Sequence, residues 1–412
     1  MRRRELIGAI AALTGCSRAG RSVTSAAPAP SPTFAPATYV ADARRLADHL
    51  EREHVTLPSR AIDWPATRSD GLAQVQTATD PAAFLAAIER LCDALYDPQL
   101  RVRPAQGPTR RRLPADIVLE EVDGAFEVDA VRRGSAAAAA GLRAGQRVTA
   151  FDGEPLAERI GRFRPAHGKG HDPRRDAFAR AAAVAGVRGA PRRFAIVEGT
   201  TRRTIEVPAD DPDPSPPVST VTEDDLAIIR LSALDETVAD AFDAALAPLR
   251  DTAGLLLDLR GCMAVAPAAA ERVLGRFVEG RSRYASKAAR DGDGLEAPWP
   301  VYVNERGPWP YEGRVVVIVD RFTAGAPEDL AAALQGLGRA SVVGPPTAGW
   351  STHTRAFVLP NTRVSVEVPY QKLFGVDGIA RDRWTPDVPL SRDEDVDARA
   401  REILRRDIRR NE

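Results

Sequence analysis

Two short apolar runs place the strongest constraint on the fold of this chain. Residues 255–259 read Leu-Leu-Leu-Asp-Leu, and residues 315–319 read Val-Val-Val-Ile-Val. Strands that are apolar on both faces are typical of parallel sheets covered by helices on each side. An amphipathic helical pattern precedes the first run and another follows the second, so strand and helix alternate. The C-terminal half therefore predicts an α/β core with a largely parallel sheet and flanking helices.

The second apolar run leads directly into a tight turn and a helical segment, over residues 320–340. Pro327 is suited to the first helical turn, and Glu328 and Asp329 complement the positive end of the helix. Catalytic serines and cysteines often occupy such a turn, because the free N–H groups of the helix favour developing negative charge. The turn here reads Thr-Ala-Gly-Ala, and Gly325 has no side chain with which to attack a substrate. The pattern therefore predicts the scaffold of a nucleophile without the nucleophile.

The N-terminus reads as a targeting signal. Three arginines are followed by an apolar stretch from Leu6 to Leu13, which ends in Leu-Thr-Gly-Cys. This arrangement resembles the bacterial lipobox, in which Cys16 would be lipidated. Residues 1–16 are therefore expected to be a lipoprotein signal peptide, and the Pro-, Ala- and Ser-rich residues 17–38 a disordered tether. We expect an exported protein that is lipid-anchored to a bacterial membrane and faces the periplasm or the cell exterior. The alternative is a soluble protein with an apolar start.

The charge balance argues against a nucleic-acid partner. The chain has 57 basic and 57 acidic residues, so its formal net charge is +0. Because the two signs are mixed along the sequence, no strongly basic field exists to hold a phosphate backbone.

Three regions follow the tether. Residues 39–104 have apolar positions at helical spacing, and Asp80-Pro81 is a typical helix start. Residues 105–208 alternate strand-like runs with one short Ala-rich helix closed by Gly141. Residues 209–219, rich in Asp and Pro, predict a linker to the α/β core at residues 220–412.

A motif in the middle region resembles the signature of bacterial PDZ domains. Residues 134–146 read Gly-Ser-Ala-Ala-Ala-Ala-Ala-Gly-Leu-Arg-Ala-Gly-Gln. PDZ domains bind an extended peptide as an added strand, between a sheet edge and a helix. The resemblance implies a groove between a strand and the helix at residues 136–140. Its expected peptide-binding residues are Ile117, Val118, Leu119 and Ala137. The alternative is a packing module with a closed groove, because Pro-Ala-Asp at residues 114–116 replaces the Gly-rich loop that captures a carboxylate.

Further motifs in the C-terminal region occur in a consistent order. They are the Asp-Leu-Arg-Gly end of the first apolar strand, the strand-turn-helix around Gly325, Val-Gly-x-x-Thr-x-Gly at residues 343–349, and Pro-Asp-Val at residues 386–388. With the PDZ-like region, this order resembles the C-terminal processing peptidases, or tail-specific proteases, over residues 40–405. The same serine peptidase family includes the tricorn protease. The resemblance implies a ClpP/crotonase-like α/β core, a PDZ-like β-rich domain and an N-terminal helical segment.

The residues that carry catalysis in this family are replaced at the matching positions. Gly325 stands at the position of the nucleophilic serine, in a segment of the form T-A-S-A-x-E. Trp350 follows T-x-G, where serine–lysine members have their lysine base. Gln99 stands where the tricorn-like branch has a histidine base, in L-x-D-x-H. Glycine has no oxygen, and neither an indole nor a neutral amide is a general base.

The oxyanion loop of the family has the form D-L-R-x-N-x-G-G, and residues 258–265 read Asp-Leu-Arg-Gly-Cys-Met-Ala-Val. Its asparagine and glycine positions hold Cys262, Ala264 and Val265. A Cys262–His353 pair, or Ser351, could have taken over catalysis, but we favour a packed thiol and a surface imidazole.

The remaining cysteines and histidines predict no further chemistry. Cys92 and Cys262 could pair in an oxidising compartment, but they are far apart in sequence and we expect two free, buried thiols. His167 and His171 have the spacing of metal ligands on a helix, yet the intervening glycines indicate a loop. No third ligand is evident, so we expect neither a metal nor another cofactor.

Two hypotheses for function follow. In the first, the protein is a catalytically silent, peptidase-shaped lipoprotein that binds peptides or protein C-termini, with an active protease or another envelope protein as a possible partner. In the second, it is an enzyme that cleaves peptides through a rearranged site. We favour the first, because covalent catalysis needs a nucleophile and a base within hydrogen-bond reach of each other.

Overall fold

The computed structural model describes residues 35–211, 216–223, 226–235 and 237–410. Residues 33–412 form one compact unit. The predicted signal peptide, the lipidation site Cys16 and most of the predicted tether lie outside the described residues. The last part of that tether is helical, because the first helix already begins at Pro36. Among the helices of the described residues, none combines the length and the apolar character that a bilayer crossing requires.

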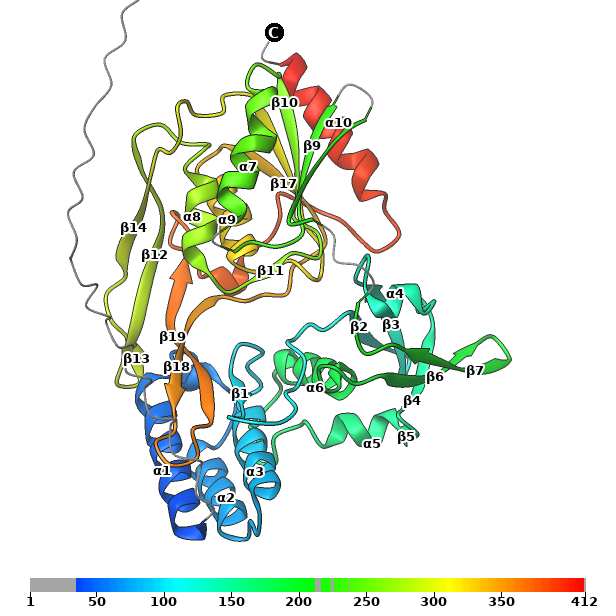
Figure 1. Ribbon diagram of the computed structural model, residues 1–412, viewed down its shortest axis with the longest axis vertical. Helices are drawn as coiled ribbons and strands as arrows, with labels where there is room; N and C mark the ends of the chain where they lie inside the picture. Colours follow the sequence, from blue (N-terminus) through cyan, green and yellow to red (C-terminus); the bar gives the residue numbers. More distant parts are fainter. Residues whose placement is uncertain (1–34, 212–215, 224–225, 236, 411–412) are drawn as a thin grey trace, which may run out of the picture. The chain divides into compact units, whose positions relative to one another are not determined.

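The N-terminal segment is helical, as the apolar spacing predicts. It contains α1 (Pro36–Glu53), η1 (Leu57–Ser59), α2 (Trp64–Gln76) and α3 (Pro81–Asp93). Asp80 caps α3 by accepting a hydrogen bond from Ala83 N at 2.8 Å. The apolar faces of α1 and α3 pack against a hairpin of the C-terminal region, formed by β18 (Thr352–Val358) and β19 (Ser365–Phe374) (Figure 1). Sequence elements that lie far apart therefore share one core.

The PDZ-like region is a small antiparallel sheet with three helices. Its strands are β2 (Ile117–Val122), β3 (Ala125–Val131), β4 (Arg147–Phe151), β5 (Glu154–Pro155), β6 (Arg192–Glu198) and β7 (Thr201–Val207). The order is β2-β3-β4-β6-β7, and β5 pairs with β4. The helices are α4 (Ala136–Ala139), α5 (Leu156–Gly161) and α6 (Pro173–Ala185). Since β2 is an edge strand, one of its sides is available for contacts outside the sheet.

The α/β core confirms the predicted fold class. Its main sheet has the order β20-β17-β15-β10-β9-β8, and all neighbours are parallel except β8 and β9. The strands are β8 (Val218–Glu223), β9 (Leu226–Leu231), β10 (Gly254–Asp258), β15 (Arg314–Ile318), β17 (Ala340–Gly344) and β20 (Val388–Pro389). The two apolar runs of the sequence form β10 and β15 at its centre. The predicted linker ends two residues early, because β8 begins at Val218.

Helices cover both faces of this sheet, which explains why its central strands are apolar throughout. Leu255 and Val317 pack into a core with α7 (Val238–Leu246), α8 (Pro267–Leu274) and α9 (Ala326–Gly336). Leu256 and Val316 point to the opposite face, where they meet α10 (Val396–Arg409). Figure 1 shows α10 and α7 on opposite sides of the strands. Short 3₁₀ helices, η2 (Ala247–Leu249) and η3 (Arg381–Arg383), complete this region.

A second sheet and a short two-stranded pairing bring together segments that are distant in sequence. A second sheet contains β1 (Arg101–Arg103), β12 (Arg281–Asp291), β13 (Gly294–Leu295), β14 (Trp299–Asn304), β18 and β19. A two-residue parallel pair joins β11 (Met263–Ala264) to β16 (Ala324–Gly325). This short pair lies at the strand-to-helix turn singled out in the sequence.

Candidate functional site

The turn between β15 and α9 has a backbone conformation that favours glycine. Gly325, the residue before α9, has φ 72° and ψ −122°, in a region that side chains rarely adopt. The surroundings reinforce this restriction. A Cβ atom at Gly325 would lie 2.2 Å from Ala264 O and 3.1 Å from Cε3 of Trp350. The turn therefore has no space for a serine unless its neighbours move.

The predicted oxyanion loop lies directly on this turn. Met263 pairs with Ala324, and Ala264 pairs with Gly325, as parallel strands. In addition, Ala324 N donates a hydrogen bond to Cys262 O at 3.0 Å. The N–H groups of Ala324 and Gly325 are thus used within the protein. Val265, the last of the predicted loop positions, is exposed.

Trp350 fills the space beside Gly325. Only 2% of its surface is exposed. Together with Gly325 and Ala264, it lines a recess of about 10 Å³, which is room for one water molecule at most. Its Nε1 atom is buried and has no hydrogen-bond partner among the described residues. The indole of Trp350 therefore contributes to this region through apolar packing.

Glu328 holds the turn and the loop before β18 together. Its Oε2 atom accepts hydrogen bonds from Gly325 N at 2.7 Å and Trp350 N at 3.0 Å. Its Oε1 atom accepts from Thr347 Oγ1 at 2.6 Å and Gly349 N at 2.8 Å. Burial raises the pKa of Glu328 to about 7, although these four hydrogen bonds act in the opposite direction. From the sequence, Glu328 was predicted only to complement the helix dipole, although it stands three residues after the cap, where the acidic residue of a capping box lies.

The side chain of Gln99 is hydrogen-bonded to the first residue of β18. Its side-chain Nε2 donates a hydrogen bond to Thr352 O at 2.7 Å, and its Oε1 accepts from Thr352 N at 3.2 Å and from Thr352 Oγ1 at 2.8 Å. The amide is buried. Both ends of the side chain are therefore used to fix the start of β18.

The alternative nucleophiles of the sequence analysis are poorly placed. Cys262 is fully buried, and burial raises the pKa of its thiol to about 12. Its reactive thiolate is therefore scarce at neutral pH. The Nε2 atom of His353 lies 3.6 Å from Asp329 Oδ2. Ser351 is nearly buried and lines the cavity described below. Cys92 and Cys262 are both free thiols, as predicted.

His167 and His171, predicted to lie in a loop despite their metal-ligand spacing, lie outside helices and strands and away from this site. His167 Nε2 is within 2.5 Å of Asp70 Oδ2, and His171 is exposed. Across the part of the chain that the structure describes, no three His, Cys, Asp or Glu side chains are grouped in a way that could hold a metal ion.

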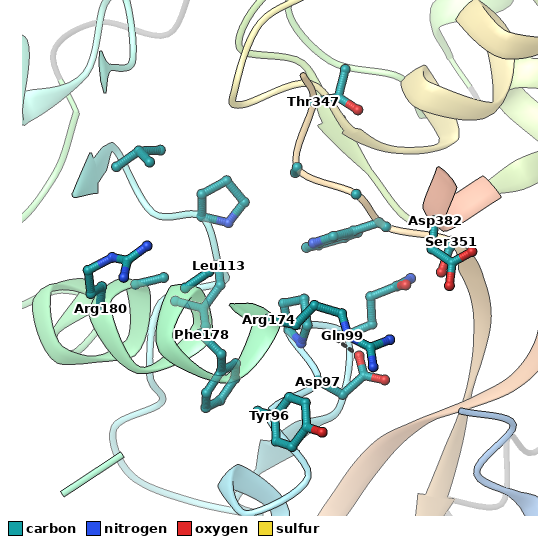
Figure 2. A pocket seen from close by; sticks show the side chains of 18 of the residues that line it. Tyr96, Asp97, Gln99, Leu113, Arg174, Phe178, Arg180, Thr347, Ser351 and Asp382 are labelled. Atoms are coloured by element: carbon teal, nitrogen blue, oxygen red, sulfur yellow. Dashed lines mark hydrogen bonds between the residues drawn. The ribbon is translucent and has the colours of Figure 1, made fainter. Parts of the chain in front are cut away.

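An open cavity lies next to the closed turn. Its volume is about 320 Å³, which is within the range of ligand pockets. One wall is β2 with α6, and another is the loop at residues 347–352. Its apolar lining includes Leu113, Pro114, Val118, Leu119, Phe178 and Trp350. Figure 2 shows Phe178 and Arg180 on α6, with Gln99 and Ser351 on the other side of the cavity.

The helix that faces β2 is α6, so the prediction of α4 as the groove helix was wrong. Ala137 on α4 is fully buried, and its N atom donates a hydrogen bond to Asp116 Oδ2 at 3.3 Å. Ile117 is also buried and packs into the core of the PDZ-like region. Of the four predicted peptide-binding residues, only Val118 and Leu119 line the cavity.

The sequence contains a local start signal for α6. Asp172-Pro173 has the same form as the Asp80-Pro81 helix start, and Gly186 ends the segment. On α6, Ala177 and Ala181 are small residues that line the cavity next to β2.

Arg180 spans the groove between α6 and β2. Its Nε donates a hydrogen bond to Leu119 O at 3.0 Å, and its Nη2 lies 2.7 Å from Glu120 Oε2. A carbonyl group at the edge of β2 is therefore occupied by a side chain of the same domain. An added peptide strand has to displace this guanidinium to pair with that carbonyl.

Comparisons with known proteins agree with this geometry. Residues 225–390 match the family model of peptidase family S41, and residues 127–164 match that of a PDZ domain. Over these residues the α/β core is similar to peptidase family S41. The resemblance to C-terminal processing peptidases with a PDZ domain is thereby confirmed. No curated protein sequence matches the chain.

Solved structures support the S41 fold across most of the chain. The photosystem II D1 C-terminal processing protease is 19% identical, with a TM-score of 0.59, over 90% of this chain and 97% of its own. Mature CPAF complexed with lactacystin is 13% identical, with a TM-score of 0.61, over 90% and 98%. A lipoprotein from Streptococcus agalactiae is 10% identical, with a TM-score of 0.50, over 91% and 99%. At these identities the likeness establishes the shared fold.

Proposed function

We propose that this protein binds extended peptides or protein tails without hydrolysing them. The observation that carries the proposal is the contrast between a closed turn and an open cavity beside it. Gly325, Ala264 and Trp350 fill the place of the reaction centre, whereas about 320 Å³ remain open between β2, α6 and the loop at residues 347–352.

The cavity suits an extended peptide in shape and chemistry. Peptides bind PDZ domains along a strand edge, where the backbone supplies hydrogen bonds and pockets hold alternate side chains. The edge strand β2 offers the backbone, and Leu119, Phe178 and Trp350 offer apolar contacts. Glu328 and Gln99 form hydrogen bonds to the loop at residues 347–352, so this wall of the cavity is held in place.

The absence of turnover is part of the proposal. Loss of either the nucleophile or the base of a serine peptidase already lowers turnover about a million-fold, and here both positions have changed. The competing hypothesis, a rearranged peptidase, requires a thiolate at Cys262 or an activated Ser351. Burial opposes the first by raising the pKa of Cys262 to about 12.

The experiment uses a fragment of residues 33–412, which form one compact unit. Short fluorescein-labelled peptides with apolar C-termini are titrated against it by fluorescence anisotropy, and unfolded casein and the same peptides are followed by mass spectrometry. We expect saturable binding and no cleavage. Reproducible cleavage that is lost in Cys262→Ala or Ser351→Ala would establish the rearranged peptidase and refute the proposal.

A matched pair of variants tests the location of the site. Ala181→Trp places an indole in the cavity between α6 and β2, whereas Ala139→Trp places one on the exposed side of α4. We expect the first variant to lose at least about tenfold in peptide affinity, because a filled pocket excludes the ligand. The second is expected to bind like the unchanged fragment. Equal effects would place the binding site elsewhere.

We propose further that the protein is exported and anchored through a lipid on Cys16, so that peptide binding takes place at a membrane surface. The basic, apolar leader and its Leu-Thr-Gly-Cys end support this. In a bacterial host, the full chain is expected in the membrane fraction and Cys16→Ala in the soluble fraction. An unchanged distribution would refute the anchor. An active protease or another envelope protein is the partner class that fits this location, and crosslinking in the host tests it.

A further inference from the structure

A cluster of arginines stands apart from the peptide cavity, at the edge of the second sheet. We infer that Arg101, Arg103, Arg112 and Arg188 form a binding site for the phosphate groups of an anionic phospholipid surface. The site is called the arginine patch below. The inference goes beyond peptide binding and rests on the proposed lipid anchor for the choice of a membrane as partner.

Three segments build the patch. Arg101 and Arg103 lie on β1, which pairs with β19 so that Arg101 faces Glu367 and Arg103 faces Ser365. Arg112 lies at the end of the loop that follows β1. Arg188 lies on the loop between α6 and β6, and its N atom donates a hydrogen bond to Thr109 O at 2.8 Å. Backbone pairing therefore holds the four residues in one region.

Positive charge in the patch exceeds negative charge. Glu367 is the carboxylate that Arg103 and Arg112 share, the latter at 3.2 Å from Oε1. Arg101 makes its hydrogen bond to a neutral group, Arg110 O, at 3.4 Å. Burial and the neighbouring guanidinium groups of Arg112 and Arg103 lower the pKa of Arg101 to about 10, so it remains charged at neutral pH. Arg101, Arg103 and Arg112 thus lie near one carboxylate, and Arg188 lies close enough to Arg101 and Arg112 to lower the pKa of both.

Part of the patch is accessible from outside the protein. The Arg103 side chain is 43% exposed, the Arg112 side chain is 24% exposed, and Arg188 is exposed. Arg101 and Arg112 also line a recess of about 50 Å³, together with Arg110 and its ion-pair partners Glu89 and Asp93. Guanidinium groups match phosphate in shape and bind it through paired hydrogen bonds. Phosphate is therefore the ligand that the excess charge and the exposed guanidinium groups favour.

The position of the N-terminal end of α1 supports phospholipid headgroups as the source of the phosphate. Asn361, in the turn between β18 and β19, donates hydrogen bonds to Asp42 Oδ1 at 2.8 Å and to Thr38 O at 3.5 Å. The chain thus enters α1 beside the turn that leads into β19, the strand on which the patch is built. Eighteen residues, 17–34, separate the predicted lipidation site Cys16 from the first described residue. With the proposed anchor, this number of residues sets an upper limit on the distance between the patch and the headgroups.

A charged patch next to a lipid anchor gives a second, independent contribution to membrane binding. Each arginine near an anionic surface contributes a free energy equivalent to about a fivefold change in affinity. The whole chain has a formal net charge of +0, so any preference for anionic vesicles has to come from a local concentration of positive charge.

The test uses residues 33–412, a fragment without Cys16. Residues 1–32 contain five arginines and one glutamate, which leaves 52 basic and 56 acidic residues and a formal net charge of −4. We expect this acidic fragment to sediment with vesicles of phosphatidylglycerol and phosphatidylcholine, and not with phosphatidylcholine alone. Binding should be lost at about 0.5 M NaCl, because salt screens exposed charges. Equal binding to both kinds of vesicle, or to neither, would overturn the inference.

Two triple variants with the same change in net charge locate the binding surface. Arg101→Gln, Arg103→Gln and Arg188→Gln remove the patch but retain Arg112 as the partner of Glu367. Arg143→Gln, Arg193→Gln and Arg202→Gln remove three exposed arginines of the PDZ-like region. We expect the first triple variant to lose at least about tenfold in vesicle partitioning, and the second to change less than about twofold. Equal losses would show that the arginine patch is not the site.

Further controls separate the remaining explanations. If the first triple variant melts at a lower temperature, the single variant Arg188→Gln, on an exposed loop, decides the question with an expected loss of about fivefold. If inorganic phosphate releases the fragment from vesicles where sodium chloride of equal ionic strength does not, the patch binds small anions and the lipid assignment is wrong. Because the fragment lacks Cys16, this result is independent of the anchor, and unchanged peptide affinity of the variants separates it from the peptide site.

Discussion

Gly325 shows how strongly one backbone position can limit chemistry. Its φ of 72° is unfavourable for a side chain, and Ala264 O occupies the place of a Cβ atom. The sequence identified the missing side chain correctly, but it could not reveal the occupied space. That information depends on the pairing of β11 with β16, and contacts between residues distant in sequence leave no local signal.

Replacing Gly325 by serine is expected to destabilise the fold without creating a peptidase. Backbone strain and overpacking together cost about 2–5 kcal/mol. The matched control is Gly349→Ser, because Gly349 has a similar φ of 74° with open space around it. Gly349→Ser is expected to lose only the free energy of the backbone strain, about 1 kcal/mol. Urea denaturation compares the two, and similar losses for both variants would contradict the clash with Ala264 O.

Glu328 predicts a pH dependence of stability. Its pKa is about 7 in the folded protein and 4.5 in a model peptide. Between these values the folded protein binds a proton that the unfolded chain releases. The stabilisation from this group is therefore complete below pH 4.5 and is lost as the pH rises through 7. The size of the effect is about 3 kcal/mol.

The measurement is the free energy of unfolding of the unchanged protein and of Glu328→Gln across this pH range. Glu328→Gln lacks the titrating group. The difference in free energy of unfolding between this variant and the unchanged protein should therefore narrow as the pH rises. Glu121→Gln, at an exposed position, is the control and should follow the unchanged protein. A constant difference between the unchanged protein and Glu328→Gln would show that Glu328 keeps its ordinary pKa.

At the scale of helices and strands, the sequence predicted those elements whose signals are local. The apolar runs at β10 and β15, the helix start at Asp80 and the helix after Gly325 all follow from spacing and capping residues. The groove helix was wrongly assigned to α4, because the signature motif lies there. The true wall, α6, faces β2 only through tertiary packing, although its own start signal at Asp172 is clear.

The contact between α6 and β2 predicts that Arg180 lowers the affinity for peptides. Arg180 occupies Leu119 O, which an added peptide strand would use. Arg180→Ala should therefore bind apolar tail peptides about three- to tenfold more tightly, since the ligand no longer competes with a charged hydrogen bond. Arg175→Ala, on the same helix but outside the cavity, is the control. Weaker binding by Arg180→Ala would mean that this arginine contacts the ligand.

At the scale of the whole molecule, the described regions share their cores. Phe178 of the PDZ-like region packs with α1, α3 and β19, so the predicted domain limits do not separate independent cores. Motifs that follow one another along the chain predicted the order of the regions. The sequence could not predict their contacts, because β18 and β19 join helices from the other end of the sequence.

This shared packing makes the two thiols indicators of the folded state. Cys92 belongs to the N-terminal core and Cys262 to the α/β core, and burial raises the pKa of both. In residues 33–412, neither thiol should react with Ellman's reagent at pH 8 until urea unfolds the protein, when both should react together. Reaction of one thiol well before the other would show that the two cores open separately.

The short pair between β11 and β16 also determines the order in which substitutions would have to be made to introduce hydrolytic activity into this fold. A serine introduced first at position 325 meets the carbonyl of Ala264 and pushes the neighbouring backbone aside. A rebuilt loop at residues 261–265 has to come before it, so that donors become available to a substrate. Backbone redesign is therefore the first stage, and side-chain exchanges at positions 99, 325 and 350 are the last.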